Sequence, residues 1–215
     1  MLLWIMLFGL QITYGQIGYQ INMERHSYIE SQQPSGTSNN LNIHSLGAQV
    51  GTQYWFRLKN KRIEFIPGIH VAADIGQKTS FQKYKIVNIQ AMATFPILIY
   101  PLSFTDDCNC PTFKKQGNTI KKGFHLILHP GLAFSRRNVS HDSVSTSGSS
   151  ISPFVGGGAG LDIGINKNLT LTPFLVYVRY FSDEILKTVE ISSPIHHESI
   201  NLGVRIRIHE AKRKF

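Results

Sequence analysis

The segment from residue 200 to residue 209 alternates strictly between apolar residues and small, polar or charged ones. Its apolar positions are Ile200, Leu202, Val204, Ile206 and Ile208, and the positions between them are Asn201, Gly203, Arg205, Arg207 and His209. Successive side chains of a β-strand point to opposite faces of the sheet, so the segment predicts a strand with one fully apolar face. An apolar face opposite a charged one is typical of a transmembrane β-barrel, whose outer face meets lipid.

The same alternation recurs seven more times. It predicts an all-β protein: a closed antiparallel up-and-down transmembrane barrel of about eight strands. The expected strands lie near residues 17–28, 46–57, 63–75, 87–99, 124–135, 155–165, 169–181 and 200–209. In the seventh strand, Pro173 predicts a bulge that switches the two faces. We therefore expect Tyr177 and Arg179 to point inward. Phe174, Val176, Val178 and Tyr180 are expected to point outward.

The connections predict how the barrel is oriented. Long polar gaps over residues 31–42, 76–84, 137–150 and 182–197 alternate with tight turns at residues 59–61 and 166–168. Outer-membrane barrels have short turns on the periplasmic side and longer loops outside, so both chain ends are expected in the periplasm.

One connection departs from this rule. The segment 101–123 is expected on the periplasmic side, yet it is long and carries Cys108 and Cys110. We interpret it as a tolerated insertion. A disulfide across one intervening residue is geometrically awkward, and two thiols are too few for a zinc site. We therefore favour a structural or redox-sensitive loop pair over a metal site.

The N-terminus is apolar over residues 1–10 and is followed by small Gly15, which predicts a signal peptide over residues 1–15 and a barrel domain over residues 16–215. No other apolar run is long enough for a transmembrane helix. The net charge of +9 comes largely from turns and the tail rather than from one helix or stripe. Export and the strand pattern therefore argue against nucleic acid as a partner. The basic turns and tail, with Lys59, Lys61, Lys121, Lys122 and Lys212, suggest contact with anionic head groups of the inner leaflet.

The inward positions carry a balanced set of charges. They are Glu24, Glu64, Asp74 and Asp162 on the acidic side and Arg57, Arg179, Arg205 and Arg207 on the basic side. An eight-stranded barrel is just wide enough for its own side chains to fill, and buried charges must be paired. We expect a packed polar network, not a conduit, with the glycines of residues 156–164 leaving room for the arginines.

Candidate chemistry is sparse. His70, His125 and His129 share the inward face, and hydrogen-bonded histidines are favoured over a metal site because spacing alone does not supply a third ligand. The sequence shows no zinc, phosphate or nucleophile motif, so no cofactor is expected. His197-Glu-Ser199 opens the last strand near the outer edge of the membrane, where a histidine-activated serine would cleave lipid acyl chains. This trio faintly resembles that of the outer-membrane lipid A deacylases.

The chain as a whole resembles the small outer-membrane β-barrel proteins of Bacteroidetes-type bacteria, which are akin to OmpA-like and PorT-like barrel domains. The resemblance rests on Tyr14-Gly-Gln16, on the glycine-rich segment 156–164, on Asn168-Leu-Thr-Leu-Thr-Pro-Phe174 and on Leu202-Gly-Val-Arg-Ile-Arg207. It implies a bacterial outer-membrane location and a barrel of about eight strands. The basic segment 210–214 before Phe215 departs from the usual assembly signal, which ends the last strand on an aromatic residue.

These observations favour a non-enzymatic integral outer-membrane barrel with a filled polar interior. Its expected partners are outer-membrane lipid and an unidentified extracellular ligand or protein at the loops. A lipid A-modifying acyl hydrolase built on His197 and Ser199 is one alternative. A soluble, lipocalin-like barrel that binds a small apolar ligand is another, and it requires the apolar faces to point inward. A pore is disfavoured by the strand number.

Overall fold

The computed structural model describes residues 16–30, 42–58, 62–78, 84–103, 123–141, 144–166, 168–181 and 195–209. These segments are almost entirely β-strand, with one short 3-10 helix, η1 (Pro101–Ser103). The predicted signal peptide, the cysteine-bearing loop and the basic turns and tail lie outside the described residues, apart from the ends of the segment 101–123. Among the residues that are described, no helix is long and apolar enough to cross a membrane.

Eight strands form the wall of the barrel and five short ones extend them. The eight are β1 (Gln16–Glu30), β2 (Asn42–Tyr54), β5 (Gly68–Lys78), β6 (Tyr84–Thr94), β9 (Gly131–His141), β10 (Val144–Leu161), β12 (Leu169–Tyr180) and β13 (Ile195–His209). The extensions are β3 (Phe56–Arg57), β4 (Ile63–Phe65), β7 (Ile97–Ile99), β8 (Phe124–Leu128) and β11 (Ile163–Gly164). The strand pattern was therefore predicted correctly in number and approximate position.

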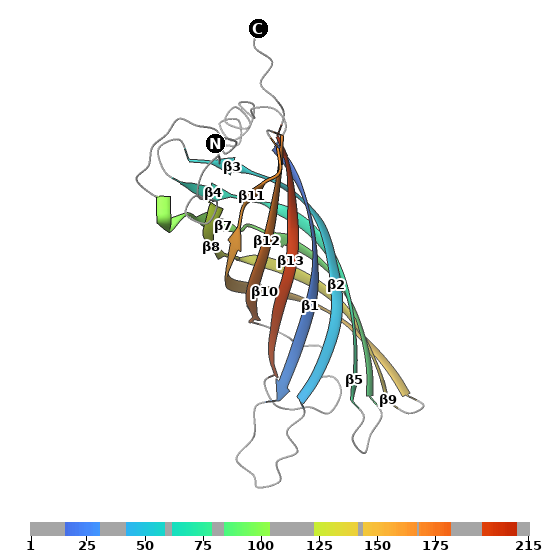
Figure 1. Cartoon of the computed structure of the whole chain (residues 1–215). Coiled ribbons are helices and arrows are strands. Elements are labelled where there is room, and N and C mark those ends of the chain that lie inside the picture. Colours follow the sequence, from blue (N-terminus) through green and yellow to red (C-terminus); the bar gives the residue numbers. More distant parts are fainter. Residues whose placement is uncertain are drawn as a thin grey trace, which may run out of the picture.

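The sheet closes on itself. Each of the eight strands pairs antiparallel with its neighbours in chain order, β10 pairs with β12, and β1 pairs with β13 (Figure 1). The start of β1 meets the end of β13, because Gln16 pairs with His209. We call this the turn end of the barrel, and the opposite end the loop end. The expectation of a closed antiparallel up-and-down barrel is confirmed.

The register fixes the tilt of the strands. A row of paired residues leads from Tyr177 in β12 once around the wall to Ser147 in β10, whereas the direct partner of Tyr177 in β10 is Gly157. The two ends of the row are therefore ten residues apart along β10. Such a stagger tilts the strands of a closed barrel, typically by about 35–45°, and sets the width of its interior.

Three prolines lie side by side where the strands bend toward the turn end. Pro67 separates β4 from β5, Pro96 separates β6 from β7, and Pro130 separates β8 from β9. A proline has no N–H to give to a ladder, but its carbonyl still accepts. The neighbouring strand donates in each case: Tyr54 N–H to Pro67 O at 2.9 Å, Ile66 N–H to Pro96 O at 2.8 Å and Phe95 N–H to Pro130 O at 2.9 Å. The wall thus bends without losing its ladder.

The outer face is apolar from strand to strand. Met23 is 72% exposed, Leu46 68% and Ile69 67%, and many other large apolar side chains on the remaining strands are comparably exposed. Aromatic rings gather on this face toward the turn end, where Phe56 and Phe65 stack at 5.2 Å. Soluble monomers rarely expose contiguous apolar patches of this extent, whereas a transmembrane barrel presents such a band to lipid. The lipocalin-like alternative is wrong, because it needs these side chains inside.

Pro173 does not switch the faces of β12, which corrects the predicted bulge. The pairing with β13 runs without a break, from Thr172 opposite Arg205 to Phe174 opposite Gly203. On its other side, Pro173 lies where the β10 ladder ends and the β11 ladder begins, so no pairing with β10 or β11 depends on its N–H. The buried residues of this part of β12 are therefore Phe174, Val176, Val178 and Tyr180. Tyr177 and Arg179, both expected inside, are exposed on the outer face.

The long loop expected over residues 137–150 is mostly strand. β9 continues to His141, and β10 begins at Val144 as its direct partner. The run from Ser145 to Ser150 is rich in hydroxyl groups and predicts a loop, because polar faces on both sides of a strand give no alternation. The backbone pairing with β9 nevertheless satisfies those of its N–H and C=O groups that point toward β9.

Gly203 allows β13 to pack closely on its neighbours. A Cβ at this position would collide with the Asn22 side chain and would lie 2.6 Å from the carbonyl oxygen of Ile21 and 2.8 Å from the Phe174 ring. Because a backbone oxygen cannot move aside cheaply, Gly203→Val should destabilise the barrel by about 1–3 kcal/mol or more. Leu202→Val, on the outer face, is the matched control. Urea unfolding in detergent micelles checks this, and equal stability of the two variants would contradict it.

Candidate functional site

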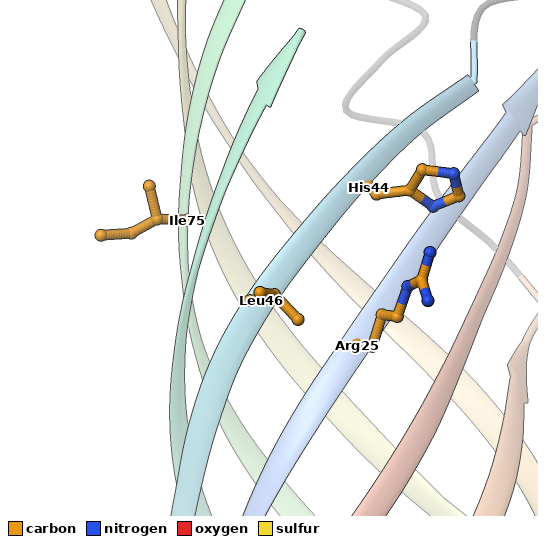
Figure 2. A pocket seen from close by; sticks show the side chains of 4 residues that line it. All are labelled: Arg25, His44, Leu46 and Ile75. Atoms are coloured by element: carbon orange, nitrogen blue, oxygen red, sulfur yellow. The ribbon is translucent and has the colours of Figure 1, made fainter.

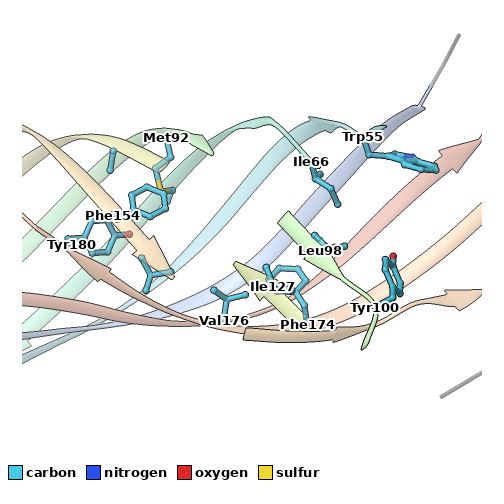
Figure 3. Packing of buried hydrophobic residues seen from close by; sticks show 13 residues of the cluster. Trp55, Ile66, Met92, Leu98, Tyr100, Ile127, Phe154, Phe174, Val176 and Tyr180 are labelled. Carbon is cyan, nitrogen blue, oxygen red and sulfur yellow. The ribbon is translucent and has the colours of Figure 1, made fainter. Parts of the chain in front are cut away.

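The interior of the barrel has a polar side and an apolar side. Buried polar residues dominate the inner face of β13, β1, β2 and β5. Apolar side chains of β12 and β10, joined by Met92, Leu98 and Ile127, pack against one another inside the wall (Figure 3). The apolar side was not predicted, because the pattern of β12 is apolar on both faces. Large side chains thus fill the lumen from both sides.

A carboxylate–arginine network occupies the turn end of the lumen. Arg207 donates to Glu64 Oε2 at 2.8 Å and forms an ion pair with Asp162. The Tyr100 hydroxyl lies 2.9 Å from the Glu64 carboxylate and 2.7 Å from that of Asp162, and Thr172 donates to Asp162 Oδ1 at 2.6 Å. All of these side chains are buried. Charge-assisted bonds of this kind are among the strongest in proteins, and here they link five strands and connecting segments around the wall.

Arg205 lies one inward position along β13 from Arg207. Its guanidinium donates to Gln20 Oε1 at 3.3 Å and lies over the Phe174 ring at 5.3 Å from the ring centre. Together the two arginines balance the charges of Glu64 and Asp162. An isolated buried charge would be costly, so this neutrality is a condition for burying the group as a whole.

A second network occupies the loop end of the lumen and contains a pair of histidines. His26 Nδ1 lies 2.9 Å from His197 Nε2, and His26 Nε2 lies 3.1 Å from Glu24 Oε2. Rings stack on both sides of His197, Tyr28 at 4.4 Å and Tyr180 at 4.0 Å between centroids. A positive charge completes it, since the Arg137 guanidinium lies 4.7 Å from the centre of the Tyr28 ring.

Asp74 belongs to the same end of the lumen. Its carboxylate accepts hydrogen bonds from the Ser45 hydroxyl at 2.9 Å and from the Asn88 amide at 2.8 Å, and it lies 3.9 Å from His26 Nε2. These side chains come from β1, β2, β5 and β6, which are adjacent in the wall. The network therefore ties the first half of the barrel together from the inside.

The structure separates the predicted inward charges into three groups. Six are buried in the lumen: Glu24, Glu64, Asp74, Asp162, Arg205 and Arg207. Arg57 is half-buried in β3, opposite Glu64 in β4. Arg179 is on the outer face, because the predicted switch at Pro173 does not occur.

Several lumen residues were missed by sequence reasoning. Arg137 was assigned to a loop, although it is buried in β9. His26 and Tyr28 were overlooked, although the alternation through Glu24 places both on the inner face. The glycines of β10 do not make room for the arginines: a Cβ at Gly160 would lie against His125, and a Cβ at Gly156 or Gly158 against β12.

The three histidines considered for a metal site do not converge. His70 Nε2 lies 3.1 Å from the Thr94 hydroxyl, and His125 Nδ1 lies 3.0 Å from the carbonyl oxygen of Gly123. His129 packs edge-on against Phe154. Within the described segments, no group of three or more histidine, cysteine, aspartate or glutamate side chains is arranged to hold a metal ion.

The geometry argues against the lipid-facing hydrolase. Ser199 and His197 are both buried inside the lumen, at 1% and 2% exposure, while Glu198 lies on the outer wall. A serine that attacks membrane lipid must reach the acyl ester from the outer face. The three residues alternate along β13, so they cannot share one face. This alternative fails because Ser199 shares the inward face of β13 with Asn201 and Arg205, away from lipid.

Comparison with known proteins adds little beyond the fold. No protein-family model matches the chain, and no curated protein matches it. Among solved structures, the chain is similar to neisserial surface protein A, at a TM-score of 0.48 and 13% identity over 92% of this chain and 100% of that one. It is also similar to Ail, the attachment invasion locus protein of Yersinia pestis, at 0.49 and 12% over 91% and 100%. A third is the outer membrane protease OmpT of Escherichia coli, at 0.41 and 8% over 92% and 99%.

Removal of Arg207 from the turn-end network should destabilise the barrel. Arg207→Met leaves Glu64 and Asp162 buried without their close partner, which should lower the free energy of unfolding by about 3–5 kcal/mol. Arg136→Lys, which keeps the positive charge at an exposed position of β9, is the control and should change it by no more than about 0.5 kcal/mol. Adding Asp162→Asn to Arg207→Met should recover part of the loss. Urea unfolding followed by tryptophan fluorescence measures all three, and equal effects of the two arginine variants would refute the role of the network.

Proposed function

We propose that the protein is an integral β-barrel of the bacterial outer membrane with a non-enzymatic, structural or binding role. The observation that carries this proposal is the inverted polarity of the barrel: large apolar side chains on the outside, and ion pairs and amides within. Only closed barrels and helices satisfy all backbone hydrogen bonds in a lipid core. A closed barrel has no unpaired strand edge that would be exposed to lipid.

The connections support an orientation with both chain ends in the periplasm. The ends of the described chain, Gln16 and His209, pair at the turn end. The connections after β1 and β12 leave from the loop end, which outer-membrane barrels direct outward. The partners are accordingly outer-membrane lipid around the wall and an extracellular ligand or protein at the loop end.

The packed lumen supports a role other than conduction. Arg137, Arg205 and Arg207 are among the largest fully buried side chains, together with Tyr28 and Tyr100. They obstruct the lumen at both ends, and a barrel of eight strands has little width to spare. Binding of an extracellular partner is therefore left to the surface at the loop end rather than to the lumen.

The first test is the location of the expressed chain. We expect recovery in the outer-membrane fraction and extraction only with detergent. An unboiled sample should migrate differently from a boiled one in SDS gels, because a closed membrane barrel resists SDS until it is heated. Recovery in the soluble fraction with no heat-dependent shift would overturn the proposal.

A single substitution distinguishes lipid from water at the outer face. Met23 lies near the middle of β1 and is 72% exposed. In a membrane, Met23→Arg should cost about 2–4 kcal/mol of stability. In water, the same change at an exposed position should cost no more than about 0.5 kcal/mol. Met23→Leu is the control, and urea unfolding in lipid vesicles is the measurement; a negligible effect of the arginine would argue against a lipid-facing wall.

A further inference from the structure

A groove lies on the outer face of the barrel toward the loop end. Its main part has a volume of about 480 Å³ and is lined by Arg25, His44, Leu46 and Ile75, from β1, β2 and β5. An adjoining hollow of about 200 Å³ shares Arg25 and His44 and extends across β1 to β13 and β12. In Figure 2 the Arg25 guanidinium extends toward the His44 ring, and Leu46 lies beside them. The groove therefore combines a basic centre with apolar walls.

The basic centre is unusual for its position. On the outer face of β1, Arg25 follows Tyr19, Ile21 and Met23, so it is the first charge after an apolar run. Neither Arg25 nor His44 forms an ion pair with any residue that the structure describes. Arginine is always protonated at physiological pH, so the groove carries at least one uncompensated positive charge at the edge of an apolar surface.

The acidic neighbour of the groove is already engaged. Glu198 lies at its β13 side and is hydrogen-bonded by the Tyr177 side chain. It also stands opposite Arg179 in the register of β12 and β13. Glu198 accepts this hydrogen bond and forms no ion pair with Arg25, both being among the described residues, so the charge of Arg25 remains for an external anion.

The groove walls define what kind of anion fits. Leu46 is 68% exposed and Ile75 is 55% exposed, and both border the basic centre. A free phosphate ion would contact Arg25 but leave these side chains uncovered. An amphiphile covers both, with its anionic head group at Arg25 and His44 and its acyl chains along the apolar face below. Arginine and histidine both donate hydrogen bonds to phosphate oxygens, and such charge-assisted bonds are strong where water is scarce.

We propose that this groove binds the phosphorylated head group of an acylated glycolipid in the outer leaflet. The proposal rests on the proposed function, because it requires the barrel to span the outer membrane with its loop end outward. Arg25 and His44 hold the phosphate, and Leu46 and Ile75 contact the first part of an acyl chain. The barrel then carries a specific lipid at a defined site on its wall, beside the surface that meets extracellular partners.

The test measures lipid retention by the full-length barrel. The protein is inserted into phosphatidylcholine nanodiscs that contain a small fraction of diphosphoryl lipid A, and the lipid that stays bound after detergent exchange is counted by native mass spectrometry. The wild type should retain diphosphoryl lipid A over its dephosphorylated analogue by about tenfold. Arg25→Gln combined with His44→Gln should abolish this preference. Arg136→Gln, which removes an exposed arginine of β9 outside the groove, should leave it within about twofold.

The outcomes separate this proposal from the proposed function. A heat-dependent mobility shift for every variant shows that the barrel is intact, and a chain that fails to insert into the nanodiscs overturns both proposals. Insertion without a preference for the phosphorylated lipid overturns the groove alone. If Arg136→Gln loses the preference for the phosphorylated lipid as fully as the double variant does, binding depends on general surface charge, and the proposed groove site is overturned. Full displacement of the lipid by millimolar inorganic phosphate would assign the site to the free ion instead.

Discussion

Closure of an eight-stranded sheet with a stagger of ten residues is the constraint on which the rest of this structure depends. It leaves an interior that side chains from opposite walls can fill. Most inward positions are consequently removed from bulk water, and every charge buried there must be matched nearby. Closure also leaves the outer face as the only surface that can bear a continuous apolar band. The number of strands and their stagger thus explain why the interior is a matched polar network and the outer face is apolar.

The interior meets this constraint in two ways. At the turn end, Arg207 draws the carboxylates of Glu64 and Asp162 together from distant parts of the chain, and Tyr100 completes the contact. Across from the polar strands, Phe174 and its apolar neighbours fill the space without needing partners. Such packing stabilises by contact, whereas the ionic network stabilises only as a complete set. As a result, β13 lies between β1, whose inner face is polar, and β12, whose buried residues from Phe174 onward are apolar.

The sequence predicts this fold well where alternation separates the two faces, as in β1, β2 and β13. It fails where polarity does not distinguish them. In β12, Val176 and Val178 are as apolar as Leu175 outside, so only the register with β13 decides which face is buried. Pro173 is harmless for a reason that no local pattern reveals, namely the change of partner strand beside it. His26 and His197 are 171 residues apart in sequence, and only the pairing of the first and last strands brings them together.

The paired β9–β10 hairpin has a consequence for recognition at the loop end. Its backbone is ordered in strands from Gly131 to His141 and from Val144 onward, including the serine-rich stretch that follows Val144. Freezing a flexible loop on binding costs about 1–2 kcal/mol of conformational entropy for each residue ordered. A partner that contacts these paired strands avoids most of that cost, because the conformation it recognises exists beforehand. The protein therefore offers at least one contact surface whose affinity is set by complementarity rather than by the entropy of ordering.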